Sequence, residues 1–301
     1  MRFPSFFSEV KNLTTWLGLT ALGGALYWLT RQRAEQPPHK PGLALVTGAS
    51  SGIGAAYARA LARRGYDLLL VARRQQHLTA LAEELRQQWP IAAMPFPADL
   101  TNPADLAATV ARIQQEPRLT LLVNCAGFGT NERFANSDIA NHRAMIQLHI
   151  HAPTQLIHAA LPAMRRNHHG GIINVSSIVA YMPTARSSTY CATKAHLITF
   201  TQALHQELRG SGVRVQALVA GFTDTEIFHK AGMNEMRLPS FLWMTPEAVV
   251  AHSLRDFERG GPVLSIPGAL NRVMVALLRR LPRPWLYTLD RQLPALLNVD
   301  D

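Results

Sequence analysis

A tyrosine and a lysine four residues apart form the pair in this sequence best suited to proton transfer. Tyr190 and Lys194 are the ends of the segment Tyr-Cys-Ala-Thr-Lys, and Ser177 precedes the tyrosine. On a helix, residues i and i+4 share one face, so the lysine ammonium can lie near the phenol. The phenol of a tyrosine in a free peptide has a pKa of about 10, and a nearby cation favours its phenolate form. The pattern predicts that Tyr190 acts as general acid or base while Ser177 hydrogen-bonds the reacting oxygen.

A glycine-rich segment predicts a site for a phosphate-bearing cofactor. Residues 47–54 read Thr-Gly-Ala-Ser-Ser-Gly-Ile-Gly, between a short apolar run and an alanine-rich segment of helical period. Glycine lets the backbone approach a pyrophosphate, and a helix N-terminus supplies N–H groups and partial positive charge. The residues expected to contact the cofactor in this segment are Thr47, Gly48, Ser50, Ser51, Gly52, Ile53 and Gly54.

Six short apolar runs must position these residues. They cover residues 43–46, 67–71, 92–96, 119–124, 171–176 and 213–219. Longer segments of helical period separate them, which is typical of parallel strands covered by helices on both faces. The sequence therefore predicts an α/β fold with a Rossmann-like, doubly wound parallel sheet in one domain, residues 42–267.

In this order and spacing, the motifs resemble those of the short-chain dehydrogenase/reductase family. The glycine segment, Asn-Cys-Ala-Gly at 124–127, Ser177 and the Tyr190–Lys194 pair all occur within residues 42–225. The resemblance implies an oxidoreductase that interconverts a carbonyl and a secondary alcohol, with Lys194 also holding the nicotinamide ribose and no metal required. It further implies a homodimer and cofactor contacts by Asp99, Leu100, Asn124, Ala126, Gly127, Tyr190, Lys194, Gly221 and Thr225.

Two positions depart from the family pattern. His149 stands where most members carry a catalytic Asn, and Ala220 replaces the proline before Gly221. An imidazole both donates and accepts hydrogen bonds, so His149 is expected either to hold a relay water or to pack as a neutral residue.

The alternative function is a catalytically degenerate, membrane-associated sensor or scaffold that binds NADP(H). The intact serine, tyrosine and lysine favour the enzyme.

The end of the second apolar run predicts NADP(H) as the cofactor. Ala72 stands where NAD-using members usually carry an Asp, and Arg73 and Arg74 follow it. No acid is present to repel a 2′-phosphate, and Arg73 could pair with that phosphate bidentately.

The substrate site is expected along residues 224–244, which are rich in Met, Phe, Leu and Trp, although core packing also explains them. Tyr181 and Met182, shortly after Ser177, would add apolar surface to the cleft. An apolar, adaptable lining favours a lipophilic substrate such as a long-chain, acyl or steroid-like ketone, with reduction the expected direction.

The two ends of the chain predict contact with a membrane. Residues 1–35 contain an uncharged apolar stretch, 13–30, flanked by basic residues and aromatic rings, which is typical of a membrane anchor. Residues 36–41 form a proline-rich linker. Residues 268–301 are expected to form a basic amphipathic helical tail that lies on an anionic leaflet or covers the cleft as a lid.

Composition narrows the partners further. The formal net charge is +10, yet the arginines are dispersed and no recognition motif accompanies them, so nucleic acid is not expected as a partner. The two cysteines show no metal-ligand spacing, and no metal site is predicted.

Deletion of residues 1–35 should leave the catalytic domain folded and release much of the protein from membranes. The linker separates the apolar stretch from the first strand, and flanking charge together with cofactor supply favours a catalytic domain on the cytosolic face. Membrane fractionation of cells that express the full and shortened chains measures the effect. A full-length chain that fractionates as soluble without detergent would refute the anchor.

Overall fold

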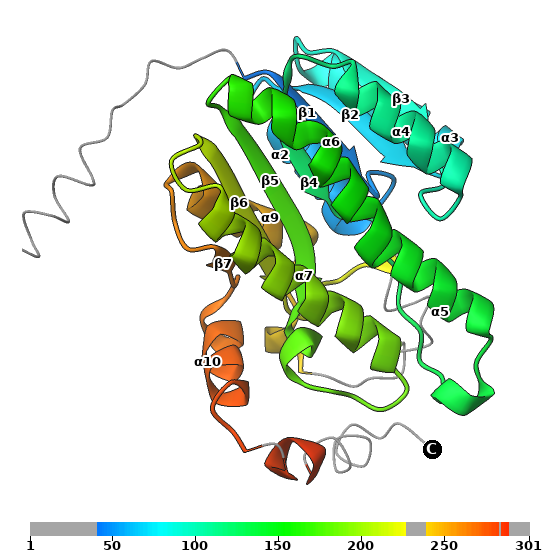
Figure 1. Ribbon diagram of the computed structural model, residues 1–301, viewed down its shortest axis with the longest axis vertical. Helices are drawn as coiled ribbons and strands as arrows, with labels where there is room; N and C mark the ends of the chain where they lie inside the picture. The colour runs from blue at the N-terminus through cyan, green and yellow to red at the C-terminus, as the bar shows by residue number, and fades with distance from the viewer. Residues whose placement is uncertain (1–40, 227–238, 283, 289–301) are drawn as a thin grey trace, which may run out of the picture. The chain divides into compact units, whose positions relative to one another are not determined.

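The computed structural model describes residues 41–226, 239–282 and 284–288, and its centre is a parallel sheet of seven strands (Figure 1). The strand order is β3-β2-β1-β4-β5-β6-β7. All six apolar runs form strands where the sequence predicts them, whereas the seventh strand, only two residues long, leaves no periodic signal to find. The strands are β1 (Leu43–Thr47), β2 (Asp67–Ala72), β3 (Ala93–Pro97), β4 (Leu119–Asn124), β5 (Gly170–Ser177), β6 (Val213–Ala220) and β7 (Leu264–Ser265).

Helices cover both faces of the sheet, and each face has its own apolar core. One core joins α2, α3 and α9 to the sheet, and the other joins α4, α6 and α7 to its opposite face. A sheet covered on both faces needs strands that are apolar throughout, which is why the strands read as continuous apolar runs. The helices are α2 (Gly52–Ala62), α3 (Gln75–Gln88), α4 (Pro103–Gln114), α5 (Ile139–Ile146), α6 (Ala152–Arg166), α7 (Ser188–Glu207), α9 (Pro246–Glu258) and α10 (Ala269–Leu278).

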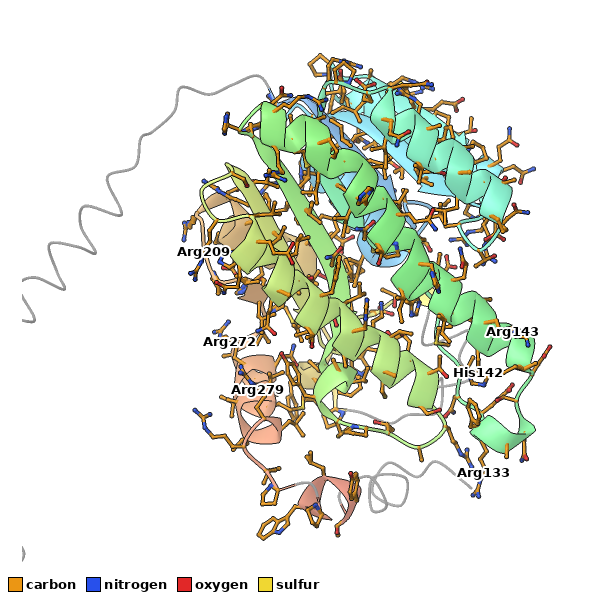
Figure 2. All side chains as sticks on the ribbon, viewed as in Figure 1. Arg133, His142, Arg143, Arg209, Arg272 and Arg279 are labelled. Atoms are coloured by element: carbon orange, nitrogen blue, oxygen red, sulfur yellow. The ribbon has the colours of Figure 1, made fainter. Side chains whose placement is uncertain are left out.

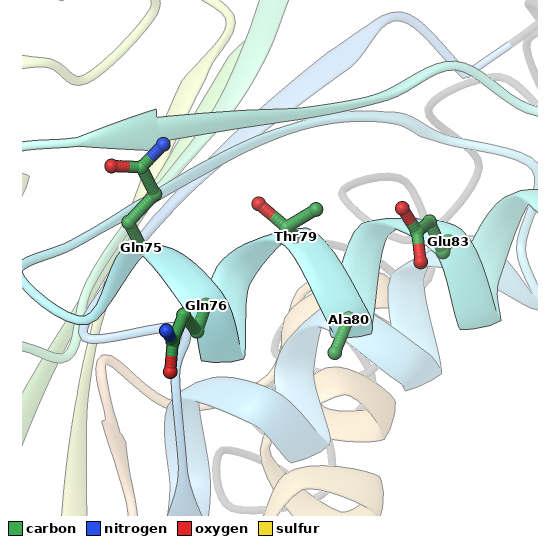
Figure 3. Close-up of a pocket in the computed structure, with 5 residues that line it drawn as sticks. All are labelled: Gln75, Gln76, Thr79, Ala80 and Glu83. Carbon is green, nitrogen blue, oxygen red and sulfur yellow. The ribbon is translucent and has the colours of Figure 1, made fainter.

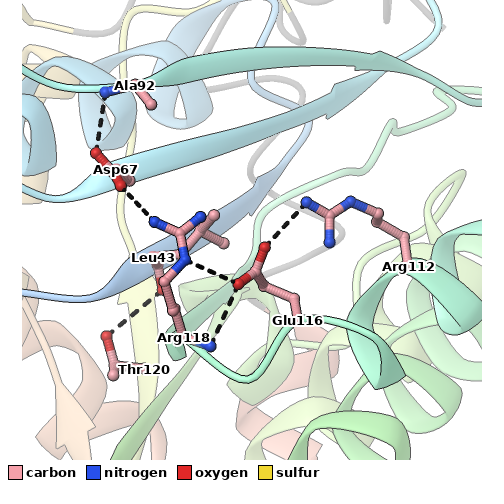
Figure 4. Close-up of polar contacts among 7 residues, drawn as sticks. All are labelled: Leu43, Asp67, Ala92, Arg112, Glu116, Arg118 and Thr120. Carbon is pink, nitrogen blue, oxygen red and sulfur yellow. Dashed lines mark hydrogen bonds and ion pairs between the residues drawn. The ribbon is translucent and has the colours of Figure 1, made fainter.

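Polar contacts tie together the edge of the sheet where the first strands begin (Figure 4). The Arg118 guanidinium lies 2.8 Å from Asp67 and 3.2 Å from Glu116. Asp67 also accepts the Ala92 N–H at 2.9 Å, and the Leu43 N–H donates to the Arg118 carbonyl at 2.7 Å. These bonds join the starts of β1, β2 and β4 and the residue before β3, so polar side chains here serve the fold.

The opposite edge, where the strands end, is built for a ligand. Chain order reverses between β1 and β4, and in open parallel sheets this switch point leaves a crevice at the carboxyl ends of the strands. The loops after β1 and β4 meet there, and a Cβ on Gly48 would lie 2.8 Å from the Ala126 Cα. The predicted cofactor segments are therefore neighbours in the fold.

The predicted terminal segments are only partly described. The apolar stretch 13–30 and nearly all of the linker lie outside the described residues, and no helix within 41–226, 239–282 and 284–288 is long and apolar enough to cross a membrane. The expected tail helix is present as α10, whereas residues 289–301 lie outside the description.

Candidate active site

The glycine segment forms a tight turn into α2 that leaves room for a phosphate group. Gly48 and Gly52 adopt left-handed backbone angles, with φ of 68° and 53°, where a side chain would be strained. A Cβ on Gly54 would collide with the Gly48 carbonyl. Ser51 is the N-cap of α2 but makes no capping hydrogen bond, so its hydroxyl does not occupy the first N–H groups of the helix. The turn therefore fits a pyrophosphate.

Thr47 joins the two loops at the switch point. Its buried hydroxyl accepts the N–H groups of Cys125 and Ala126, both at 3.0 Å. The neighbouring Asn124 amide donates to Asn174 at 2.8 Å. The sequence predicts Thr47 and Asn124 as cofactor contacts, and in the structure their side chains hold the 124–127 turn in place.

The two arginines after β2 point in different directions. Arg74 donates to the hydroxyls of Ser51 at 2.6 Å and Ser50 at 3.1 Å, and it forms an ion pair with Glu226 at 2.9 Å. Arg73 has a side chain 68% exposed and lies 3.8 Å from Asp99. The sequence predicts a cofactor contact for Arg73 and does not predict the contact of Arg74 with the glycine turn. Which of the two guanidinium groups reaches the turn depends on the backbone at the start of α3, and the sequence pattern does not show this.

The remaining predicted cofactor residues lie around the same edge. Asp99 accepts the N–H and hydroxyl of Thr101, while the side chain of Leu100 is buried in the core. The Thr225 hydroxyl donates to the Thr223 carbonyl at 3.3 Å, and its methyl carbon lies 3.1 Å from where a Cβ on Gly52 would be. The residues after β6 thus face the glycine turn.

Ser177, Tyr190 and Lys194 come together as the sequence predicts. Ser177 ends β5 near the hydroxyl of Tyr190, which lies with Lys194 on α7. The Lys194 ammonium lies 5.5 Å from the centre of the tyrosine ring and donates to the Val175 carbonyl at 3.0 Å. Ser176 donates to the Lys194 carbonyl at 2.7 Å and fastens this part of α7 to β5.

Burial sets the proton affinities of this cluster. It raises the pKa of Tyr190 to about 12, against the lowering effect of the Ser177 hydrogen bond. It lowers the pKa of the Lys194 ammonium to about 8. The sequence anticipates a tyrosine pKa lowered by the lysine together with the charge of the nicotinamide, whereas in the protein without a cofactor burial raises the pKa of Tyr190. Tyr190 is therefore protonated near neutral pH and suited to donating a proton.

A family model described as short chain dehydrogenase matches residues 42–236. The chain belongs to this family. One relative agrees with the assignment. It is an uncharacterized oxidoreductase of Myxococcus xanthus, 34% identical over 254 residues, which are 83% of this chain and 96% of the relative.

Two solved structures resemble the chain. The short-chain dehydrogenase from Sphingobium yanoikuyae in complex with NADPH is 37% identical, with a TM-score of 0.72 over 80% of this chain and 97% of the other. The bulky-bulky ketone specific alcohol dehydrogenase from Comamonas testosteroni is 31% identical, with a TM-score of 0.69 over 81% of this chain and 96% of the other. The chain is therefore an oxidoreductase of the short chain dehydrogenase family, with the Rossmann-like fold.

His149, at the position of the usual family asparagine, links two parts of the site. Its Nε2 accepts the Phe128 N–H at 3.2 Å, which places the proton on Nδ1, 2.9 Å from the Thr193 hydroxyl. Burial, and then the charge of Lys194, hold the pKa of His149 well below its usual value. Both ring nitrogens bond protein groups, so a relay water would have to displace one of them. In this arrangement the neutral ring ties the loop after β4 to α7.

The predicted substrate residues Tyr181 and Met182 lie at the end of the short helical turn Ile178–Tyr181, which follows Ser177. The Tyr181 hydroxyl is buried without a hydrogen-bond partner in the described parts of the chain. The ring of Trp243, in the predicted substrate segment, lies 5.9 Å from the ring of Phe222 in the loop after β6. Residues 227–238 lie outside the description. Of the predicted substrate segment 224–244, the described residues 239–244 include Phe241, Leu242, Trp243 and Met244, whereas residues 224–226 are Asp, Thr and Glu.

A separate hollow lies along α3 (Figure 3). It is lined by Gln75, Gln76, Thr79, Ala80 and Glu83, which all belong to that one helix, so it lacks polar groups that converge from several elements. Within the described ranges, no group of three or more His, Cys, Asp or Glu could hold a metal ion. The described side chains of the site that are suited to proton transfer are Ser177, Tyr190 and Lys194.

The lowered pKa of Lys194 predicts a pH-dependent stability. Between pH 8 and the ordinary lysine value of about 10.4, the unfolded chain binds a proton at Lys194 that the folded chain does not, so stability rises with pH. Relative to Lys194→Met, the wild-type protein should gain about 3 kcal/mol of unfolding free energy between pH 7 and pH 11. Urea unfolding of both proteins measures this. An unchanged difference across that range would show that the ammonium titrates normally.

Proposed function

We propose that this dehydrogenase interconverts a carbonyl and a secondary alcohol on a lipophilic substrate with NADP(H), in the direction of reduction. The arrangement of Ser177, Tyr190 and Lys194 beside the glycine turn carries the proposal. A protonated tyrosine at the carboxyl edge of β5 is the group that a ketone oxygen needs as it becomes a hydroxyl.

The protein residues divide the work at the carbonyl oxygen. The Tyr190 hydroxyl donates its proton to that oxygen, and the Ser177 hydroxyl donates a hydrogen bond to it as negative charge develops. The Lys194 ammonium, 5.5 Å from the tyrosine ring, stabilises the phenolate that the tyrosine leaves behind. The nicotinamide of the cofactor supplies the hydride when bound. His149 holds the loop and helix that frame these groups.

NADP(H) as the cofactor is supported by the arginine pair and by a relative. No acid follows β2 directly, and Arg73 is exposed and contacts Asp99 only at 3.8 Å, so it can turn to a 2′-phosphate. Arg74 lies against Ser50 and Ser51 of the glycine turn, which suits the pyrophosphate that NADPH and NADH share. The Sphingobium yanoikuyae relative is described in complex with NADPH.

A lipophilic substrate is supported by the apolar side of the site. Tyr181, Phe222 and Trp243 present rings near Ser177 and the loop after β6, and Ile178 is buried with them. The Comamonas testosteroni relative is described as specific for bulky-bulky ketones. A ketone with large apolar groups on both sides, such as a long-chain, acyl or steroid-like ketone, fits this lining best.

We place the working enzyme at a membrane, with residues 42–301 on the cytosolic face and residues 13–30 as the anchor. The apolar stretch between basic flanks supports the anchor, and the supply of NADP(H) supports the side. A homodimer is the expected assembly by family resemblance. Membrane lipid and a lipophilic small molecule are the proposed partners.

Tyr190→Phe tests the proposed acid. The change removes one oxygen and keeps the ring, so turnover of a bulky ketone should fall about 10²- to 10⁴-fold while NADPH binding stays nearly unchanged. Loss of NADPH absorbance gives the rate, and quenching of tryptophan fluorescence gives the binding. Activity within about twofold of the wild type would show that another group donates the proton.

The two arginines should respond differently to alanine. Arg73→Ala removes a charge-assisted contact to the 2′-phosphate, so NADPH binding should weaken about tenfold or more while NADH binding hardly changes. Arg74→Ala disturbs Ser50 and Ser51, so both cofactors should bind more weakly. Titration of each variant with both cofactors measures this. If Arg73→Ala weakens NADPH and NADH equally, the NADP(H) preference does not come from Arg73.

A further inference from the structure

We propose that the outer face of α10, together with the residues after it, docks onto the surface of an anionic lipid bilayer. The outer face of α10 is defined as Leu270, Val273 and Leu277, and the residues after the helix are Trp285 and Tyr287. These five are the exposed large apolar side chains of the described chain beyond residue 268. The readout of the test is lipid contact, so the proposal can fail while the proposed reductase activity stands.

The orientation of α10 is fixed by its other face. Val275 and Leu278 are buried, and Val275 belongs to the same apolar cluster as Ile178. Asn271 packs against Gly221 in the loop after β6 and donates to the Pro267 carbonyl at 2.8 Å. Because these contacts hold the inner face on the protein, the apolar residues opposite are directed outward.

The outward residues repeat with helical spacing and are too exposed to serve the core. Val273 is 55% exposed and Leu277 58%, and with Leu270 they follow positions i, i+3 and i+7 of one helix face. Trp285 is 66% exposed, while its neighbour Leu286 is buried. A contiguous row of exposed apolar side chains indicates a surface that meets a partner.

The charge around this face indicates an anionic partner. Residues 259–289 contain five arginines and no aspartate or glutamate. Figure 2 labels Arg272 and Arg279 beside α10. Arg272 and Arg280 hydrogen-bond main-chain carbonyls of Ile266 and Ala276, and no acid in this stretch of sequence neutralises them. A positive rim around apolar residues complements the headgroups and acyl chains of an anionic leaflet.

The aromatic residues favour a bilayer over an acidic protein groove. Tryptophan and tyrosine are enriched where headgroups meet hydrocarbon, because each ring has an apolar body and a polar group. Trp285 and Tyr287 flank the buried Leu286 and are both exposed. They can therefore enter the headgroup region while Leu286 keeps the segment on the protein.

Docking of this face would bring the bilayer close to the site. The Arg279 guanidinium lies 5.9 Å from the Tyr181 ring, and α10 contacts the turn of residues 178–181. A helix is about 10 Å thick, so the leaflet would lie about one helix diameter from Tyr181. Under the proposed function, a lipophilic ketone would then have a short route from membrane to active site.

Quenching of Trp285 by brominated lipid tests the docking in the full-length chain. Residues 13–30 can hold the chain on any vesicle, so a local readout is needed. The quenching of Trp285 is the fluorescence quenching of the protein minus that of its Trp285→Phe variant. It is measured with vesicles of brominated phosphatidylcholine, alone or mixed with phosphatidylserine, at low and high salt.

Two variants and matched controls make the readout specific. Leu277→Glu changes the apolar row, and Ile139→Glu, at a position 53% exposed on α5, is its control. Arg272→Gln with Arg280→Gln lowers the charge, and Arg143→Gln with Arg165→Gln is the control at other exposed arginines. Each arginine near an anionic surface contributes roughly fivefold in partition, so the charge variant should weaken the docked state roughly 30-fold at low salt.

The expected result is Trp285 quenching in anionic vesicles that falls in phosphatidylcholine alone, at high salt and in both α10 variants, but not in the controls. Absence of Trp285 quenching in anionic vesicles would overturn the proposal, and so would equal quenching in the α10 variants. A lower oligomeric mass for Leu277→Glu in detergent would instead identify a second copy as the occupant. A lower unfolding temperature for that variant would identify another segment of the same chain.

Discussion

The site depends on a cation held in the protein interior. The Lys194 side chain is only 5% exposed, and its ammonium donates to the Val175 carbonyl at the end of β5. A buried charge is costly, so the surrounding structure must hold it in one place. Ser176 fastens the lysine backbone to the same strand, and the lysine charge also helps to keep His149 neutral. The tyrosine, the loop after β4 and α7 are all arranged around this group.

The parallel sheet explains how residues far apart in sequence share one edge. Every strand pair is parallel, so β1, β4, β5 and β6 end on the same side. The glycine turn, the 124–127 turn, Ser177 and the loop after β6 follow these four strands directly. The opposite edge is closed by Arg118 and its acidic partners. One edge therefore contributes stability and the other is left for chemistry.

Much of this was predictable from sequence because strand period, glycine spacing and the tyrosine–lysine interval are local signals. The six longer strands and the approach of Ser177 to Tyr190 are where the residues indicate. The rest depends on tertiary contacts. Sequence could not tell that Arg74 would turn to the glycine loop, or that both nitrogens of His149 would find protein partners. Nor could it tell which apolar residues of α10 face inward.

The central claim is that the site transfers hydride to a ketone carbon while the protein supplies the proton to its oxygen. The most direct measurement uses NADPH that carries deuterium on the transferable position of the nicotinamide, with a bulky ketone, in ordinary water. Mass spectrometry of the product should find one deuterium on the carbinol carbon and oxidised cofactor in equal amount. An alcohol whose carbinol hydrogen comes from water, or cofactor binding without any alcohol, would contradict the account.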